Sequence, residues 1–310
     1  MNITTTIKLE NFLSHNHILK YGHTSKFKPQ LVLNDIEFIF EMCRRCSYVS
    51  QNPEYKLKSE NTCIMLDNDT VVNAYAQTFK GIEGNGKKKG THGITIMTGL
   101  INASMLMSVA IAQFRIDSNI DKLTTTCNWI GVEAVKNNGC FTSKMLWEGI
   151  EIFNYVTNGI VGIEANSYLT GALLSVIGHE LGHICLAHTI RGDRSNGISR
   201  NDERQADLFA HSVVTTTPFS SYTVLGTLFT EVIFTWMSKG HTGPATTHPH
   251  SRERVYNTMA SHDEILTELG ITMDNIDSFL PPKNSSPIES IDEDDYGDDE
   301  DDEDFSIDFH

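Results

Sequence analysis

The chain has 310 residues, of which 39% are hydrophobic, so it can bury the core of one large domain or two small ones. Its formal net charge of −16 is concentrated at one end, because 13 of its 40 acidic residues lie between Glu289 and His310 and no Lys or Arg lies there. The other 27 acidic residues nearly balance the 24 basic ones. A near-neutral body offers no basic surface for nucleic acid, so nucleic-acid binding is not expected.

The start of the chain and its cysteines indicate the compartment. The first residues, MNITTTIKLENFL, lack the basic start and apolar run of a secretory signal, and we expect no run of 18 or more residues to be apolar enough to span a bilayer. Without export, the six cysteines are expected to be reduced thiols. Cys43 and Cys46 form a lone CxxC pair, which favours two half-buried thiols on a helix over half of a zinc site. We therefore expect a soluble, cytoplasmic protein.

The predicted elements follow a polar segment, residues 1–30. Apolar residues at helical spacing predict an amphipathic helix over 31–50. Two strands are predicted next, joined by a glycine- and lysine-rich turn, at Thr70–Phe79 and Gly93–Thr98. Residues 120–165 show no clear pattern. The other predicted elements are helices, at Gly99–Phe114, Tyr168–Ile190, Asn201–Val214 and Tyr222–Ser238.

These elements predict a three-part organisation of the chain. After the polar segment, residues 31–280 are expected to form one mainly helical α+β domain with a small sheet. Residues 281–310 carry the run DEDDYGDDEDDED, which cannot bury a core and is predicted to be a disordered acidic tail.

One pentapeptide carries the clearest chemical signal. It is His179-Glu180-Leu181-Gly182-His183, inside the apolar frame ALLSVIG…ICLA. Residues four apart lie on one face of a helix, so both imidazoles can bind one metal ion from the same side. Glu180 is rotated from them by one residue and can reach a water bound to that metal. Such polar side chains are costly to bury in an apolar helix without a partner of this kind.

A third ligand is needed, because a lone HExxH pattern also arises by chance. Metzincins require Gly and His where this chain has Leu186 and Thr189, so that class is excluded. Glu203 and Asp207, in the run Glu-Arg-Gln-Ala-Asp, are again four apart on a predicted helix. One carboxylate can complete a tetrahedral zinc site that leaves the fourth position for water. The other can accept the Nδ1–H of a ligand histidine and fix its tautomer.

Two other residues near this constellation are less favoured as ligands. His188 lies five residues after His183, about 140° around a continuous helix, so it is expected to point away from the metal as a surface or capping residue. Asp202 is the main alternative to Glu203 as the third ligand.

The combination of motifs resembles a known group. HELGH, ERQAD and Thr247-His248-Pro249 with Arg254 resemble the core of the M48 metallopeptidases. The segment NAYA, which starts at Asn73, and the strand Ile94–Leu100 resemble that family's NAFA element and substrate-binding edge strand. The short gap before ERQAD and the run THPHSRERVY resemble more closely the bacterial phage-exclusion (Lit-type) peptidases, which are cytosolic zinc proteases that cleave translation elongation factor Tu.

The resemblance implies a role for each matching residue. It implies zinc ligation by His179, His183 and Glu203, with Glu180 as the general base. It also implies supporting roles for His248 and Arg254; the alternative interpretation is a loop histidine and a surface arginine without such roles. His248 would donate to the oxyanion or cap the zinc in a resting state. The implied substrate-binding strand comprises Asn73, Ile94, Thr95, Ile96, Met97 and Thr98.

The sequence thus predicts a soluble zinc endopeptidase of the gluzincin kind, with one Zn2+ per chain and a protein substrate, for which a translation factor is one candidate. Two alternatives from other classes stay open. One is a zinc-binding interaction module without turnover, against which the intact Glu180 argues. The other is an interaction protein that acts through its acidic tail.

Overall fold

A computed structural model describes residues 29–79, 91–157, 159–190, 196–217, 220–240 and 251–282. The N-terminal elements are α3 (Pro29–Arg45), α4 (Ser47–Ser50), α5 (Pro53–Glu60), β1 (Thr62–Asp67), β2 (Ala74–Phe79) and β3 (Thr91–Met97). The central helices are α6 (Thr98–Asp117), α7 (Ile120–Lys136), α8 (Ser143–Ile152), α9 (Gly159–Cys185) and the short 3-10 turn η1 (His188–Ile190). The C-terminal elements are α10 (Asn196–Thr215), α11 (Ser220–Gly240), α12 (Ser251–Ser261), α13 (Asp263–Glu268) and η2 (Ile276–Phe279).

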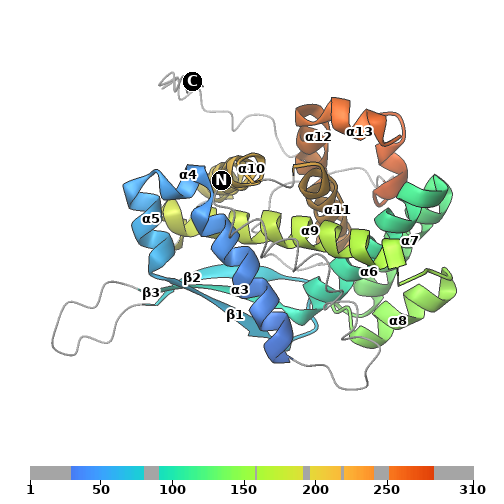
Figure 1. The fold of residues 1–310 in the computed structure, drawn as a ribbon, viewed down its shortest axis with the longest axis horizontal. Helices are drawn as coiled ribbons and strands as arrows, with labels where there is room; N and C mark the ends of the chain where they lie inside the picture. The colour runs from blue at the N-terminus through green and yellow to red at the C-terminus, as the bar shows by residue number, and fades with distance from the viewer. Residues whose placement is uncertain are drawn as a thin grey trace.

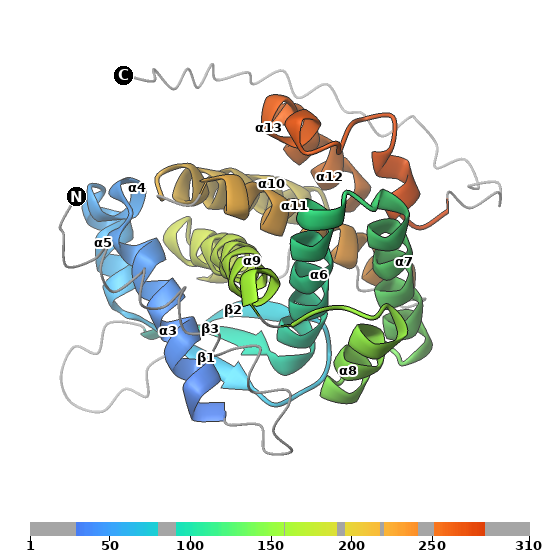
Figure 2. The same cartoon turned by 45° about the vertical axis from the view of Figure 1, so that its right-hand side comes forward.

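Helix α9 forms the centre of the fold. It contacts α3, α5, α6, α10, α11, β2 and β3, and Figures 1 and 2 show it between the sheet on one side and α10 on the other. Every residue from Ala165 to Gly182 is buried, which fits a helix that is apolar on all sides. Because the HExxH pattern lies within this helix, its polar side chains sit inside the protein. The predicted, mainly helical α+β fold is confirmed.

The small sheet has the strand order β1-β3-β2, with β1 parallel and β2 antiparallel to β3. The hairpin of β2 and β3 matches the prediction, and its connecting turn lies outside the described residues. Strand β3, however, is the central strand, so it is not a substrate-binding edge. That correction applies to Ile94, Thr95, Ile96 and Met97, and Thr98 is the first residue of α6.

The reason for this correction is a strand that the sequence did not reveal. Strand β1, with the sequence TCIMLD, pairs with β3 through contacts such as Ile64 with Ile94. It therefore occupies the side of β3 that was expected to be free. The edge strand that contacts α9 and η1 is β2.

Two helices also correct the expectation about membrane-spanning segments. Helices α6 and α9 contain 18-residue windows with mean hydropathy of 1.3 and 1.4, which meet the length and composition of a span. In each case 83% of the window is buried inside the protein. The apolar character of both helices therefore fits helices that are buried in the core.

The region without a clear sequence pattern, residues 120–165, contains α7, α8 and about the first two turns of α9. Conversely, α9 ends at Cys185, five residues before the predicted end of that helix. The six cysteines are free, and Cys43 and Cys46 are buried thiols in the N-terminal helical region. The predicted acidic tail lies outside the described residues, apart from Pro281 and Pro282.

Candidate metal centre

Small residues bring α9 and α10 into close contact. A Cβ added at Gly182 would lie 3.2 Å from Cα of Ala206 and 3.0 Å from Cβ of Phe209, distances that require the neighbouring helix to shift. At Gly178 the nearest atom, Cα of Ala210, would lie at an ordinary 3.4 Å. Both glycines directly precede the histidines of the HExxH pattern. The close contact between the helices therefore places these two imidazoles next to α10.

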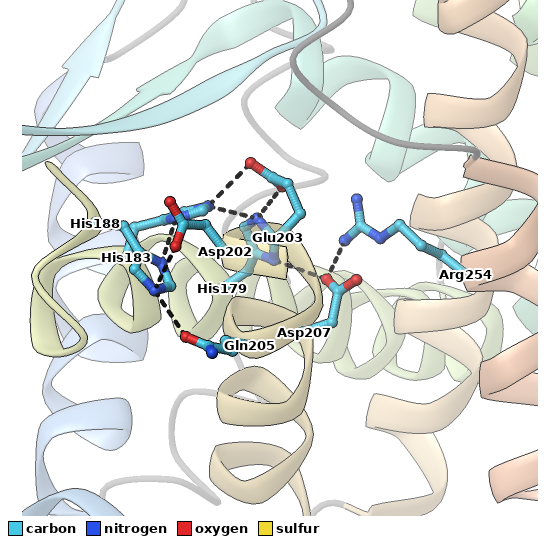
Figure 3. Close-up of polar contacts among 8 residues, drawn as sticks. All are labelled: His179, His183, His188, Asp202, Glu203, Gln205, Asp207 and Arg254. Carbon is cyan, nitrogen blue, oxygen red and sulfur yellow. Dashed lines mark hydrogen bonds and ion pairs between the residues drawn. The ribbon is translucent and has the colours of Figure 1, made fainter. Parts of the chain in front are cut away.

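Three side chains converge at this contact. His179, His183 and Glu203 offer ligand atoms that all lie within 4.8 Å of one another. His179 and Glu203 are buried, and the side chain of His183 is 12% exposed. The two Nε2 atoms are 3.1 Å apart. Oε2 of Glu203 lies 3.2 Å from Nε2 of His179, and Oε1 lies 3.4 Å from Nε2 of His183. Figure 3 shows the carboxylate of Glu203 facing both rings from one side. The cluster could hold one metal ion.

The hydrogen bonding of this cluster fits a bound cation. Nδ1 of His179 lies 2.8 Å from Oδ1 of Asp207, so the neutral ring carries its proton on Nδ1 and presents a lone pair at Nε2. That lone pair faces a second imidazole nitrogen and a carboxylate oxygen of Glu203, which are also acceptors. Electron-rich atoms that converge in a buried site repel one another unless a proton or a metal ion lies between them.

The charge state of His179 reflects the same arrangement. Burial lowers the pKa of His179, but its hydrogen bonds to Asp207 and Glu203 outweigh that effect and raise the pKa from 6.5 to about 10. In the metal-free protein the ring therefore holds an extra proton. One positive charge belongs in this site, and a divalent cation with nitrogen and oxygen ligands is a suitable replacement for that proton.

Asp207 is held in turn by Arg254, as the close-up in Figure 3 shows. Nη2 of Arg254 donates to Oδ1 of Asp207 across 2.6 Å. Burial raises the pKa of Asp207, but the nearby guanidinium and the hydrogen bond from His179 lower it below its usual value. The carboxylate is therefore an anion that can orient His179. Arg254 thus contacts the carboxylate that holds His179.

The surroundings of His183 correct the expectation for His188, which is 1% exposed and not a surface residue. Its Nδ1 lies 3.1 Å from Nδ1 of His183. The helix does not continue as far as His188, because α9 ends at Cys185 and Ala187 adopts a left-handed backbone conformation, with φ of 62°, before η1. Asp202 is not a ligand in this cluster; its Oδ1 lies 3.3 Å from Nε2 of His188.

Other predicted site residues lie as follows. Glu180 is buried on α9 between the two histidines. Asn73 directly precedes β2, and its carbonyl oxygen accepts a hydrogen bond from the backbone N–H of Met97 in β3. His248 lies outside the described residues.

One buried acid near the cluster was not identified from the sequence. Glu231 on α11 accepts a hydrogen bond from Oγ1 of Thr258 at 3.1 Å. Burial raises the pKa of Glu231 from 4.5 to about 8, and Asp207 adds to this effect while Arg254 opposes it. A single glutamate in a helix rich in apolar residues was the only sequence signal for this residue.

Comparisons with known proteins add one finding. The model of the Peptidase U49 family matches residues 150–268, which contain α9 to α13 and therefore all three clustered side chains. No curated protein and no solved structure matches the chain. Over residues 150–268 the chain is similar to a family of peptidases.

Proposed function

We propose that the protein is a zinc-dependent endopeptidase in which His179, His183 and Glu203 hold the metal. The observation that carries this proposal is the convergence of three buried ligand atoms within 4.8 Å of one another in the segment that matches a peptidase family. Two histidines and one carboxylate are a common ligand set of catalytic zinc in peptidases. The match to a peptidase family supports hydrolysis over a zinc-binding module without turnover.

The residues of the chain have distinct roles in this proposal. A bound zinc ion would lower the pKa of a water molecule and polarise the scissile carbonyl. Glu180 would accept a proton from the attacking water at its carboxylate and pass it to the leaving amine. Asp207 holds the proton of His179 on Nδ1, so that Nε2 stays available as a ligand atom. In line with the M48 and Lit-type resemblance, we propose His248 as an oxyanion donor.

The substrate would bind as an extended segment beside β2. Among the described residues no further strand pairs with the outer edge of β2, and this strand contacts α9 and η1. An extended peptide can add to such an edge through main-chain hydrogen bonds. Asn73 and the half-exposed Tyr75 lie at the start of this edge. We propose that a substrate bound beside β2 places its scissile bond at the metal centre. We also propose that the enzyme is cytoplasmic.

Metal content and one substitution test the proposal. The purified protein should contain about one zinc ion per chain, and Glu180→Gln should keep the zinc while losing nearly all proteolysis. Glu151→Gln, an exposed glutamate on α8, is the matched control and should keep full activity. A zinc-loaded Glu180→Gln protein that still cleaves at the wild-type rate contradicts the mechanism, and a folded wild type without zinc contradicts the metal site.

The substrate can be identified by the new protein termini that it leaves. Cells that express the wild type and cells that express Glu180→Gln would be compared by mass spectrometry of protein N-termini. Termini found only with the wild type identify the substrate and its cleavage site. The Lit-type resemblance makes a translation elongation factor the first candidate to test.

A further inference from the structure

The two histidines of the proposed metal centre have different partners behind them. Nδ1 of His179 faces a carboxylate directly, whereas Nδ1 of His183 faces Nδ1 of a third histidine, His188, at 3.1 Å. His188 in turn contacts Oε1 of Gln205 at 3.1 Å and Oδ1 of Asp202 at 3.3 Å through its Nε2. Figure 3 shows His188 between Asp202 and Gln205, with dashed lines to both.

The direction of these hydrogen bonds follows from the chemistry of imidazole. His183 presents Nε2 to the metal centre, so its ring proton lies on Nδ1 and is donated to His188. Nδ1 of His188 must then be the acceptor, and its ring proton lies on Nε2. From there it points at the side-chain oxygens of Gln205 and Asp202, which can accept it. One arrangement of protons thus satisfies all four side chains.

The side chains in this series of contacts are buried, which strengthens the hydrogen bonds between them. Asp202 is 2% exposed and His188 is 1% exposed, so water screens neither of them. A buried carboxylate that accepts the proton of one imidazole makes its other nitrogen a stronger acceptor, because hydrogen bonds in sequence polarise one another. The negative charge of Asp202 is therefore felt at Nδ1 of His183.

We propose that His188 is a positioning residue that connects Asp202 to the metal ligand His183 and fixes the tautomer and orientation of that ring. Asp202 would thus support the second ligand, His183, through the imidazole of His188, whereas Asp207 supports the first ligand, His179, directly. The inference rests on the metal site of the proposed function. It requires the chain reversal at Ala187, which brings His188 back from the end of α9 against the start of α10.

Three variants test the connection in steps. Asp202→Asn keeps the shape but removes the charge; His188→Asn keeps an acceptor near the position of Nδ1 but cannot reach Asp202; His188→Phe removes both contacts. Loss of the residue that orients a metal-bound histidine typically weakens metal binding roughly 10- to 100-fold. We expect His188→Phe to lose zinc affinity by about that amount, and the two asparagine variants to lose about tenfold.

Chelator competition measures the zinc affinity of the full chain, and the absorption spectrum of the Co2+-loaded protein reports ligand geometry. Neither would respond if His188 served only to fill the core. His211→Asn is the control, because His211 is an exposed histidine of α10 whose ring contacts that of His262, outside this series of contacts. If the Asp202 and His188 variants stay within twofold of the wild type in zinc affinity and keep its Co2+ spectrum, the proposal is overturned.

A second measurement needs no substitution. Long-range 1H–15N correlation NMR of the zinc-loaded wild type distinguishes the histidine tautomers. The proposal expects His183 to carry its proton on Nδ1 and His188 to carry it on Nε2, and a proton on Nδ1 of His188 overturns it. The two levels of inference can fail separately: a wild type that binds no zinc removes the metal site itself, whereas normal zinc binding with the wrong tautomer removes only the role of His188.

Discussion

Arg254 on α12 donates a hydrogen bond to Asp207 on α10 across 2.6 Å, although the two residues are 47 positions apart. Both are largely buried, with side-chain exposures of 16% and 27%. The same oxygen of Asp207 lies 2.8 Å from Nδ1 of His179. The contact therefore ties a C-terminal helix to the back of the metal centre, and α12 supports the ligands without reaching them.

Replacement of Arg254 by Met should lower the free energy of unfolding of the protein. Removing one partner of a buried ion pair leaves the other as an unpaired buried charge, which costs about 3 kcal/mol of unfolding free energy. Zinc affinity should fall as well, because Asp207 loses the group that holds it. Urea denaturation and chelator competition measure the two effects. Arg204→Met is the control, since the Arg204–Glu253 pair is exposed and should contribute less than about 1 kcal/mol. Equal losses in both variants would contradict this role for Arg254.

Two glycines on α9 should differ in their tolerance of a single methyl group. Gly182→Ala places a Cβ 3.2 Å from the backbone of Ala206 and should push α10 away, destabilising the protein by about 1–3 kcal/mol and lowering zinc affinity. Gly178→Ala meets nothing closer than 3.4 Å, so it should be neutral or gain up to about 1 kcal/mol from the higher helix propensity of Ala. Thermal melting of both variants gives the comparison. A Gly178→Ala variant as unstable as Gly182→Ala would count against the helix-contact argument.

The parts of the site that could be predicted from the sequence are those encoded by local spacing. His179 and His183 are four apart, as are Glu203 and Asp207, and a helix converts each spacing into a shared face. The apolar frame around the first pair indicated burial. Each buried polar pair needs partners, and this need predicted that the two helices face each other. The structure places Asp207 beside His179, as the spacing suggested.

The parts that could not be predicted depend on distant contacts or on one backbone angle. The central position of β3 is decided by its parallel pairing with β1, and no local feature of residues 94–97 encodes a neighbour about 30 residues away. The burial of His188 is decided by the left-handed conformation of Ala187. An alanine gives no sequence signal of that conformation, since glycine and asparagine are the residues that usually adopt it.

The buried acid Glu231 should make stability depend on pH. Its pKa is raised from 4.5 to about 8, so the folded protein favours the protonated form, and stability is lost as pH rises from about 4.5 through 8. Glu231→Gln removes this loss, so the variant should be more stable than the wild type at pH 9 and nearly equal to it at pH 5. Melting temperatures at both values test the prediction, with the exposed Glu148→Gln as control. A difference between variant and wild type that is the same at both pH values would contradict it.

Zinc binding should strengthen as the pH rises, because the ion must displace a proton from His179. The pKa of this residue is raised from 6.5 to about 10 in the metal-free protein. Its contribution to the stability of that form is therefore fully present below pH 6.5 and lost as pH rises through about 10. When one proton leaves for each ion bound, apparent affinity rises about tenfold per pH unit below the pKa.

Chelator competition at pH 6, 7, 8 and 9, corrected for the titration of the chelator, measures that slope. Asp207→Asn provides the internal control, because the carboxylate that accepts the hydrogen bond of His179 is the main group that keeps its pKa high. In this variant the rise in affinity should level off at a lower pH than in the wild type, while the affinity at high pH stays below that of the wild type because the ring is no longer oriented. An affinity that does not change with pH in the wild type would mean that His179 is already unprotonated before the metal arrives. In that case a different cation would have to offset the repulsion among Nε2 of His179, Nε2 of His183 and the carboxylate of Glu203.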